Sequence, residues 1–155
     1  MALPSAPGAG KRPVIAYASR TGTRRNLAAL RRAGWRLMVS ACGPLRSEGF
    51  RYALDNGAWT AFQRGEPFDV PAFEKAVKLL GSGADWIVLP DIVMGGLASL
   101  RFSPGWLEEL VRRPGLFGAT FLVAVQNGME PAHLRPLIGP RTGIFVGGDT
   151  AWKLA

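Results

Sequence analysis

Short apolar runs that end in polar or glycine residues alternate along the chain with amphipathic segments. The clearest run is WIVL at 86–89, inside the stretch 84–93, and it is typical of a strand buried on both faces. Pro90 ends this strand because it has no N–H to donate, and Asp91 follows directly. Asp91 therefore lies at the carboxyl end of a predicted strand, where parallel α/β folds place ligand chemistry. The alternative is that Asp91 only caps the next helix or accepts hydrogen bonds from a loop.

The same pattern predicts further strands and helices along the sequence. The predicted strands lie at 13–19, 35–41, 52–54, 86–89, 121–125 and 143–146. The predicted helices lie at 24–33, 71–80, 103–112 and 131–137, with Thr23 and Ser103 as N-caps, Pro104 in the first turn, and Gly34 and Gly81 after the ends. Strands that alternate with helices indicate an α/β fold with a parallel sheet.

The ends of the later predicted strands favour one kind of α/β fold. They carry Asp55, Asp91, Gln126 and the pair Gly147-Gly148. A TIM (β/α)8 barrel gathers such groups around one site, whereas a doubly wound sheet spreads them along an edge, so we predict the barrel type. Because that fold needs eight strands and about 250 residues, we expect about six of its units in this chain.

Composition and domain organisation follow from the same pattern. Hydrophobic residues make up 48% and charged residues 19%, which is typical of a globular protein. Residues 1–12 are expected to be a disordered leader without the apolar segment of a signal peptide, and 13–155 a partial barrel domain. Cys42 is the only cysteine, which excludes an intramolecular disulfide, and no apolar run has the length of a membrane span. We expect a cytoplasmic protein with no membrane partner.

Positive charge is concentrated in the first third of the sequence. The formal net charge is +8, and no acidic residue precedes Glu48. A field of one sign attracts polyanions, and arginine matches the geometry of phosphate. We therefore predict contacts to a nucleic-acid backbone from Arg20, Arg24, Arg25, Arg31 and Arg32. The alternative is a solvated basic face without a specific partner.

The polar residues at the strand ends suit a purine base. Asp91 only accepts hydrogen bonds when ionised, which fits the adjacent N–H groups of guanine, and Gln126 has a donor for the guanine carbonyl. Glycine at 147 and 148 allows backbone N–H groups to approach a flat ring.

Further side chains add acid–base chemistry and stacking. Asp55 is a second carboxylate suited to proton transfer. Trp59 or Tyr17 could stack on a base, although buried aromatic residues more often fill a core. With the basic face, these groups indicate a pocket for a base taken out of a nucleic acid.

Five segments resemble one known family. They are YASRTGTRRNLAALRRAGW at 17–35, DNGAW at 55–59, WIVLPDIV at 86–93, VAVQNGM at 123–129 and GIFVGGDTAWKL at 143–154. The last four resemble the tRNA-guanine transglycosylase superfamily. With the first segment, they are most similar to its phage and bacterial DNA branch, the DpdA-like enzymes that place 7-deazaguanines in DNA.

The resemblance implies a role for each matched residue. Asp55 falls on the proton-transfer aspartate of the family's DSGGF motif, with Asn56 in place of its serine as a base-binding residue. The implied base contacts are Asp91 with the guanine edge, Gln126 with the carbonyl, and Gly147 and Gly148 with the ring through their backbone.

The implied reaction is base exchange at C1′ of a nucleotide, on DNA more than on tRNA. An aspartate attacks the sugar, guanine leaves, and a 7-deazaguanine attacks the covalent intermediate. The family nucleophile lies on a later strand and has no counterpart here, because Asp149 lies at the glycine turn where the base binds. We therefore expect a C-terminally truncated chain that lacks exchange activity alone and associates, as a homo-oligomer or with a complementing chain.

No metal or cofactor is expected in this chain. The structural zinc of the tRNA enzymes lies beyond the matched segments, and Cys42 and His133 do not replace it; His133 is expected at a surface helix start. Two other functions remain open. One is a catalytically inactive module that binds bases or nucleic acid, and the other is an unrelated barrel enzyme for a phosphorylated metabolite.

Overall fold

One parallel β-sheet organises the chain. The computed structural model describes residues 14–19 and 23–154, so the expected leader and Arg20 lie outside the described residues. The strands are β1 (Tyr17–Ser19), β2 (Arg36–Ser40), β3 (Tyr52–Asp55), β4 (Ile87–Val88), β5 (Phe121–Val125) and β6 (Thr142–Val146). Each pairs in parallel with the next, in the order β1-β2-β3-β4-β5-β6. The predicted α/β class is confirmed, and this order excludes a doubly wound sheet, in which the strand order reverses.

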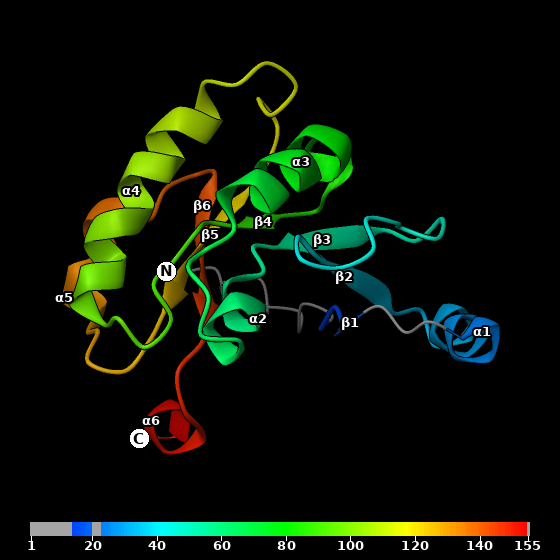
Figure 1. The fold of residues 1–155 in the computed structure, drawn as a ribbon, viewed down its shortest axis with the longest axis horizontal. Helices are drawn as coiled ribbons and strands as arrows, with labels where there is room; N and C mark the ends of the chain where they lie inside the picture. Colours follow the sequence, from blue (N-terminus) through cyan, green and yellow to red (C-terminus); the bar gives the residue numbers. More distant parts are fainter. Residues whose placement is uncertain (1–13, 20–22, 155) are drawn as a thin grey trace, which may run out of the picture.

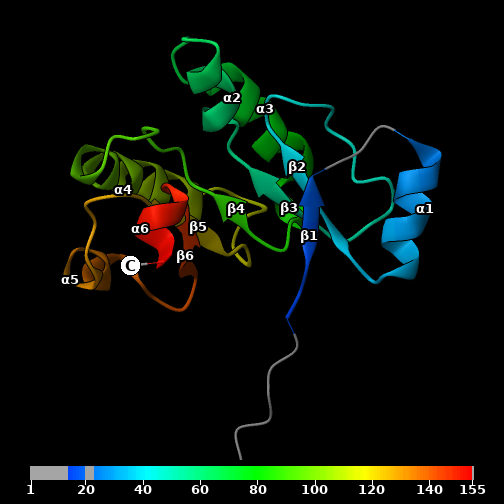
Figure 2. The ribbon, with the colours of Figure 1, turned by 90° about the horizontal axis from the view of Figure 1, so that it is seen from below.

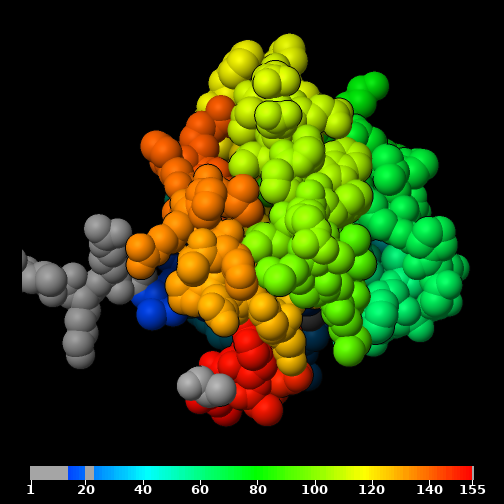
Figure 3. Space-filling model, turned by 90° about the vertical axis from the view of Figure 1, so that its left-hand side faces the viewer, coloured from blue at the N-terminus to red at the C-terminus, as the bar shows by residue number. Residues whose placement is uncertain are grey.

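Helices connect the parallel strands, except that β2 and β3 are joined by a loop at 41–51. The helices are α1 (Arg24–Arg32), α2 (Ala58–Gln63), α3 (Val70–Leu80), α4 (Leu97–Val111), α5 (Pro131–Leu134) and α6 (Thr150–Leu154), with single 3₁₀ turns at Gly81–Gly83 and Arg135–Leu137. Figure 1 shows the helices around the sheet, and Figure 3 shows α4 and α5 side by side over one face. None of the described helices is long and apolar enough to cross a membrane.

The predicted ends of α1 are confirmed. The Asn26 N–H donates to Thr23 Oγ1 at 3.3 Å, so Thr23 is the N-cap. Gly34 follows the helix with φ of +69°, a backbone conformation that glycine adopts without strain. Leu27 is buried on the inner side of α1, and the arginines lie on its exposed sides.

The predicted start of α4 is wrong. Ser103 is buried in the middle of the helix, where its Oγ donates to the Pro90 carbonyl at 2.9 Å and contacts the Ser99 carbonyl at 3.2 Å. Pro104 is also internal, although its missing N–H normally disfavours such a position. The burial of Leu100 and Leu110 and the Ser103 hydrogen bond to the end of β4 hold the helix there.

The sheet is strongly curved, because its two edge strands contact the same side chain. The Trp86 ring lies 5.0 Å from the ring of Tyr17 in β1 and 6.1 Å from that of Phe145 in β6. Alternate side chains such as Leu37, Val39 and Leu54 are buried. The curvature is consistent with a partial α/β barrel, with these aromatic rings on its inside.

A polar cluster closes the amino-terminal end of the curved sheet. Asp85 accepts hydrogen bonds from Tyr17 Oη at 2.9 Å, Arg36 Nη1 at 2.9 Å and Arg51 Nε at 3.1 Å. The side chain of Asp85 is 9% exposed and that of Arg36 20%, whereas that of Arg51 is 70% exposed. The inner Arg36–Asp85 pair therefore joins β2 to the residues before β4 away from most of the solvent.

We expect Asp85→Asn to destabilise the fold more than Arg51→Ala does. The first change leaves the half-buried Arg36 guanidinium without its carboxylate and should lower the free energy of unfolding by roughly 1–3 kcal/mol. The second removes an exposed ion pair and should lower it by less than about 1 kcal/mol. Urea denaturation of the two variants measures the difference. Equal losses of unfolding free energy would contradict the conclusion that the Arg36–Asp85 pair contributes more than the exposed Arg51.

Candidate functional site

A cavity of about 650 Å³ opens at the carboxyl ends of the strands. Its lining includes a residue from every strand: Ser19, Met38 and Ser40, Asp55, Val88, Ala124 and Phe145. The curvature of the sheet brings together Asp55, Asn56, Asp91, Gln126, Gly147 and Gly148, and all six predicted site residues line this cavity. The predicted convergence of the strand ends is confirmed.

Asp91 is held at the cavity wall by two side-chain amides. Asn56 Nδ2 donates to its Oδ1 at 2.7 Å, and Gln126 Nε2 donates to its Oδ2 at 2.7 Å. Burial raises the pKa of Asp91, and nearby Asp55 adds to this effect, while the two amides oppose it. Asp91 does not cap α4, whose N-cap is Gly96, so the capping alternative is wrong, and these two contacts come from side chains instead of loop N–H groups.

Asn56 is fixed by its own backbone contacts. It is buried, its Nδ2 also donates to the Leu89 carbonyl at 2.7 Å, and its Oδ1 accepts the Ala58 N–H at 2.9 Å. The amide therefore has one orientation, in which its nitrogen faces Asp91. Asn56 joins the ends of β3 and β4 and aligns the Asp91 carboxylate.

Gln126 is also buried, and its amide hydrogens are already used. Besides Asp91, its Nε2 donates to the Ile92 carbonyl at 3.1 Å. Its Oε1 has no hydrogen-bond partner among the described residues. Gln126 can contact a base carbonyl, as predicted, only if its amide first leaves Asp91 or Ile92.

Asp55 differs from Asp91 because no side-chain amide donates to it within the described residues. Its Oδ2 accepts the Gly57 N–H at 3.1 Å. Burial raises the pKa of Asp55 more strongly than the Gly57 N–H lowers it. The Ser40 hydroxyl lies close enough to lower this pKa as well but makes no hydrogen bond of normal geometry. A buried carboxyl with a raised pKa is a candidate for proton transfer.

The glycine turn after β6 is shaped by its neighbours. The Gly147 N–H donates to the Val125 carbonyl at 2.8 Å, so it is used within the sheet. Gly148 has φ of +75°, and a Cβ there would lie 2.6 Å from Asn127 Oδ1 and 2.7 Å from the Trp152 ring. Packing alone therefore requires glycine at 148.

Asp149 is fixed in place beside that turn. Its Oδ1 accepts the Trp152 N–H at 2.8 Å, and its Oδ2 accepts Asn127 Nδ2 at 2.5 Å. The bond from Trp152, followed by that from Asn127, lowers the pKa of this carboxyl. These contacts agree with the expectation that Asp149 does not act as the nucleophile.

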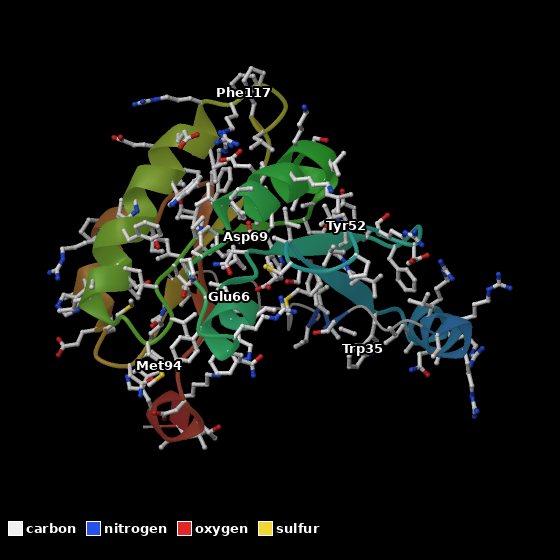
Figure 4. The ribbon with its side chains drawn as sticks, viewed as in Figure 1. Trp35, Tyr52, Glu66, Asp69, Met94 and Phe117 are labelled. Atoms are coloured by element: carbon white, nitrogen blue, oxygen red, sulfur yellow. The ribbon has the colours of Figure 1, made fainter. Side chains whose placement is uncertain are left out.

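The two predicted aromatic candidates occupy different places. Trp59 in α2 lines the cavity and is 56% exposed, so its ring is available for stacking. Tyr17 is half-buried, packs on Trp86 and donates to Asp85, so its ring is held at the amino-terminal end of the sheet. Met94, with φ of +58°, lies at the cavity mouth, 80% exposed, and Figure 4 shows it at the same end of the molecule as α2.

The arginines of α1 do not share one surface. α1 runs back along the sheet from the end of β1, so Arg24 and Arg25 lie near the carboxyl ends of the strands. Arg31 and Arg32 lie about 10 Å further along the helix, at 1.5 Å per residue. Arg31 also donates to the Glu48 carbonyl and lies 4.4 Å from the centre of the Phe50 ring. The predicted contacts to nucleic acid therefore separate into two pairs.

No metal site is found in the part of the chain that the structure describes, judged by groups of histidine, cysteine, aspartate and glutamate. His133 is exposed, and its Nδ1 accepts the Glu130 N–H at 3.0 Å at the start of α5. Its predicted position at a surface helix start is confirmed.

Comparison with protein-family models, with curated proteins and with solved structures found no match to this chain. The family resemblance of the motifs therefore stays a prediction.

Met38 and Ser40 are among the cavity residues that sequence reasoning did not single out. Both line the cavity from β2, while their neighbours Leu37 and Val39 are buried on the other side of the strand. Side chains alternate between the two faces of a strand, so Ser40, two residues after Met38, shares its face. This alternation was the signal by which the sequence could have placed both residues in the cavity.

We expect Asp55→Asn to stabilise the fold at neutral pH. Burial raises the pKa of Asp55 from its usual 3.8, so the folded state binds more protons than the unfolded state just above that pH. Stability is therefore lost as the pH rises from 3.8 through the raised pKa. The variant has no such loss, and its advantage over the parent should shrink as the pH falls toward 3.8. Free energies of unfolding of the parent and the variant, measured across this pH range, test the prediction. A stability difference between the two proteins that does not change with pH would contradict the raised pKa.

Proposed function

We propose that the cavity binds a guanine-type base of a nucleic acid for exchange with a 7-deazaguanine, in a fold of the TIM (β/α)8-barrel type. The observation that carries this proposal is the Asp91 carboxylate, held by two amides at the wall of a cavity large enough to admit a base. An ionised carboxylate has about four lone-pair sites, so sites remain for two adjacent N–H groups. Guanine presents such a pair on its pairing edge.

The charges around the cavity support a base over a phosphate. Its described lining holds three carboxylates, Asp55, Asp91 and Asp149, and no lysine, arginine or histidine. A phosphorylated metabolite would be repelled from this lining. The protein as a whole carries a net charge of +8, so phosphates are attracted to its outside. This distribution suits a nucleotide whose base enters the cavity while its backbone remains on the surface.

Two neighbours of the cavity support flat-ring binding and proton transfer. The exposed ring of Trp59 provides a stacking surface at the mouth. Asp55, with its raised pKa, provides a group that can give or take the proton of the base during exchange. Asn56 and Gln126 act as positioning residues, since their amides align Asp91.

The covalent step is assigned by the resemblance to a further aspartate. Within the described cavity lining, Asp91 and Asp149 each accept hydrogen bonds on both oxygens. Asp55 is therefore the carboxyl with the fewest partners, and its place in the motif is that of the proton carrier. Base binding and base exchange are separable parts of this proposal. Titration with guanine tests the first, and incorporation of labelled guanine into DNA and into tRNA tests the second.

We expect Asp91→Asn to weaken guanine binding by roughly 1.5–3 kcal/mol, because it removes a charge-assisted acceptor and sets an amide against the N–H groups of the base. Isothermal titration calorimetry measures the change. Asp69→Asn is the matched control, since Asp69 lies outside this cavity and asparagine also caps helices. Equal affinity in the parent and Asp91→Asn would remove Asp91 from the base site.

The two arginine pairs of α1 should differ in their effect on nucleic acid. Replacing Arg24 and Arg25 by alanine should weaken binding of all sequences alike and flatten the plot of log affinity against log salt by about 0.7–0.9 for each lost phosphate contact. Replacing Arg31 and Arg32 should have a smaller effect, because they lie at the other end of α1. Equal salt slopes for the two double variants would show that the two arginine pairs contribute equally to phosphate contacts, whichever end of α1 they occupy.

A further inference from the structure

The short helix α2 separates two cavities. Trp59 and Thr60 line the candidate base pocket. Ala61 within the helix and Arg64 just after it line a second cavity of about 560 Å³, together with the loop after β2 and residues along α3. Figure 2 shows α2 standing at the end of the molecule toward which β1 points. α2 therefore forms one outer wall of the base pocket.

Two aromatic rings on α2 are stacked on each other and exposed. The centres of the Trp59 and Phe62 rings lie 5.6 Å apart with an interplanar angle of 26°, and the residues are 56% and 44% exposed. Phe62 does not line either cavity. The pair extends from the mouth of the base pocket outward, which gives the base next to the bound one a ring to stack on.

Basic side chains gather on the other side of the same helix. Arg46, Arg64 and Lys75 line the second cavity, and none of them forms an ion pair or a side-chain hydrogen bond within the described residues. Of the two acidic residues there, Asp69 uses its Oδ1 to cap α3 through the Ala72 N–H at 2.9 Å. Figure 4 shows Asp69 and the second acid, Glu66, by α3 and α2. The three cations exceed the two acids, which suits an anion such as phosphate.

We propose that α2 docks an unpaired nucleic-acid strand. The base that flanks the bound one stacks on Phe62, and Arg46, Arg64 and Lys75 contact the phosphates beside it. This inference rests on the proposed function, since the base pocket fixes where the strand begins. Paired and stacked bases of a duplex cannot offer a free face to Phe62, so the substrate class is single-stranded DNA or RNA.

The first test compares the exposed aromatic residues Phe62 and Phe117. Phe117 is 66% exposed, and Figure 4 shows it at the opposite end of the molecule from Met94. Fluorescence anisotropy with a labelled oligonucleotide measures binding of single-stranded DNA, single-stranded RNA and a duplex of the same sequence. We expect Phe62→Ala to weaken single-strand binding about fivefold or more and Phe117→Ala to leave it unchanged. The tighter of the two single strands identifies the natural one.

The second test compares pairs of arginines. Replacing Arg46 and Arg64 by alanine should flatten the salt dependence of single-strand binding by about 0.7 for each lost contact. Replacing the exposed Arg101 in α4 and Arg112 at its C-cap removes the same charge elsewhere and should not flatten it.

Any one of three results would overturn this inference. The Phe62→Ala variant could bind single strands as tightly as the Phe117→Ala variant does, or the two double arginine variants could show the same salt dependence. The parent chain could also bind the duplex as tightly as the single strand. Failure of the base pocket is seen separately, because the parent chain would then not bind free guanine.

Discussion

The contact of both edge strands with Trp86 is the constraint on which the candidate site depends. A parallel sheet whose strands follow in sequence order has its carboxyl ends on one edge, but a flat edge would spread Ser40, Asp55 and Gln126 apart. Tyr17 and Phe145 pack against the same indole, at 5.0 Å and 6.1 Å, so the sheet curves and its strand ends surround one cavity. The Asp85 cluster beneath these rings satisfies the polar groups that the curvature buries.

A division of charge follows from this architecture. Carboxylates are collected inside the cavity, where burial raises the pKa values of Asp55 and Asp91. Arginines and lysines are exposed around it, on α1, after α2 and on α3. Buried carboxylates destabilise a fold unless donors compensate them, and here Asn56 and Gln126 supply amides to Asp91 but not to Asp55. The less compensated carboxyl, Asp55, is the one for which we propose proton transfer.

The sequence predicted the sheet and the polar residues at its strand ends better than it predicted the helices. Buried parallel strands are short apolar runs, and the polar residue after each run marks its carboxyl end, which is why Asp55, Asp91 and Gln126 were found. The helices α2 and α6 have six and five residues, too few to show a helical period. Ser103 and Pro104 carry the signature of a helix start, but the hydrogen bond from Ser103 to Pro90 depends on tertiary contacts that no local pattern encodes. The hydrogen bond from the Gln126 amide to Asp91 could not be predicted for the same reason.

Selectivity between guanine and hypoxanthine tests the role of Asp91 most directly, because the two bases differ only in the exocyclic amino group. If Asp91 accepts hydrogen bonds from both N–H groups of the pairing edge, calorimetry on the parent chain should give guanine an affinity about tenfold or more above that of hypoxanthine, since a hydrogen bond to a charged group is worth roughly 1.5–3 kcal/mol. Asp91→Asn should reduce this preference. Equal affinities of the parent chain for the two bases would contradict a guanine site at Asp91.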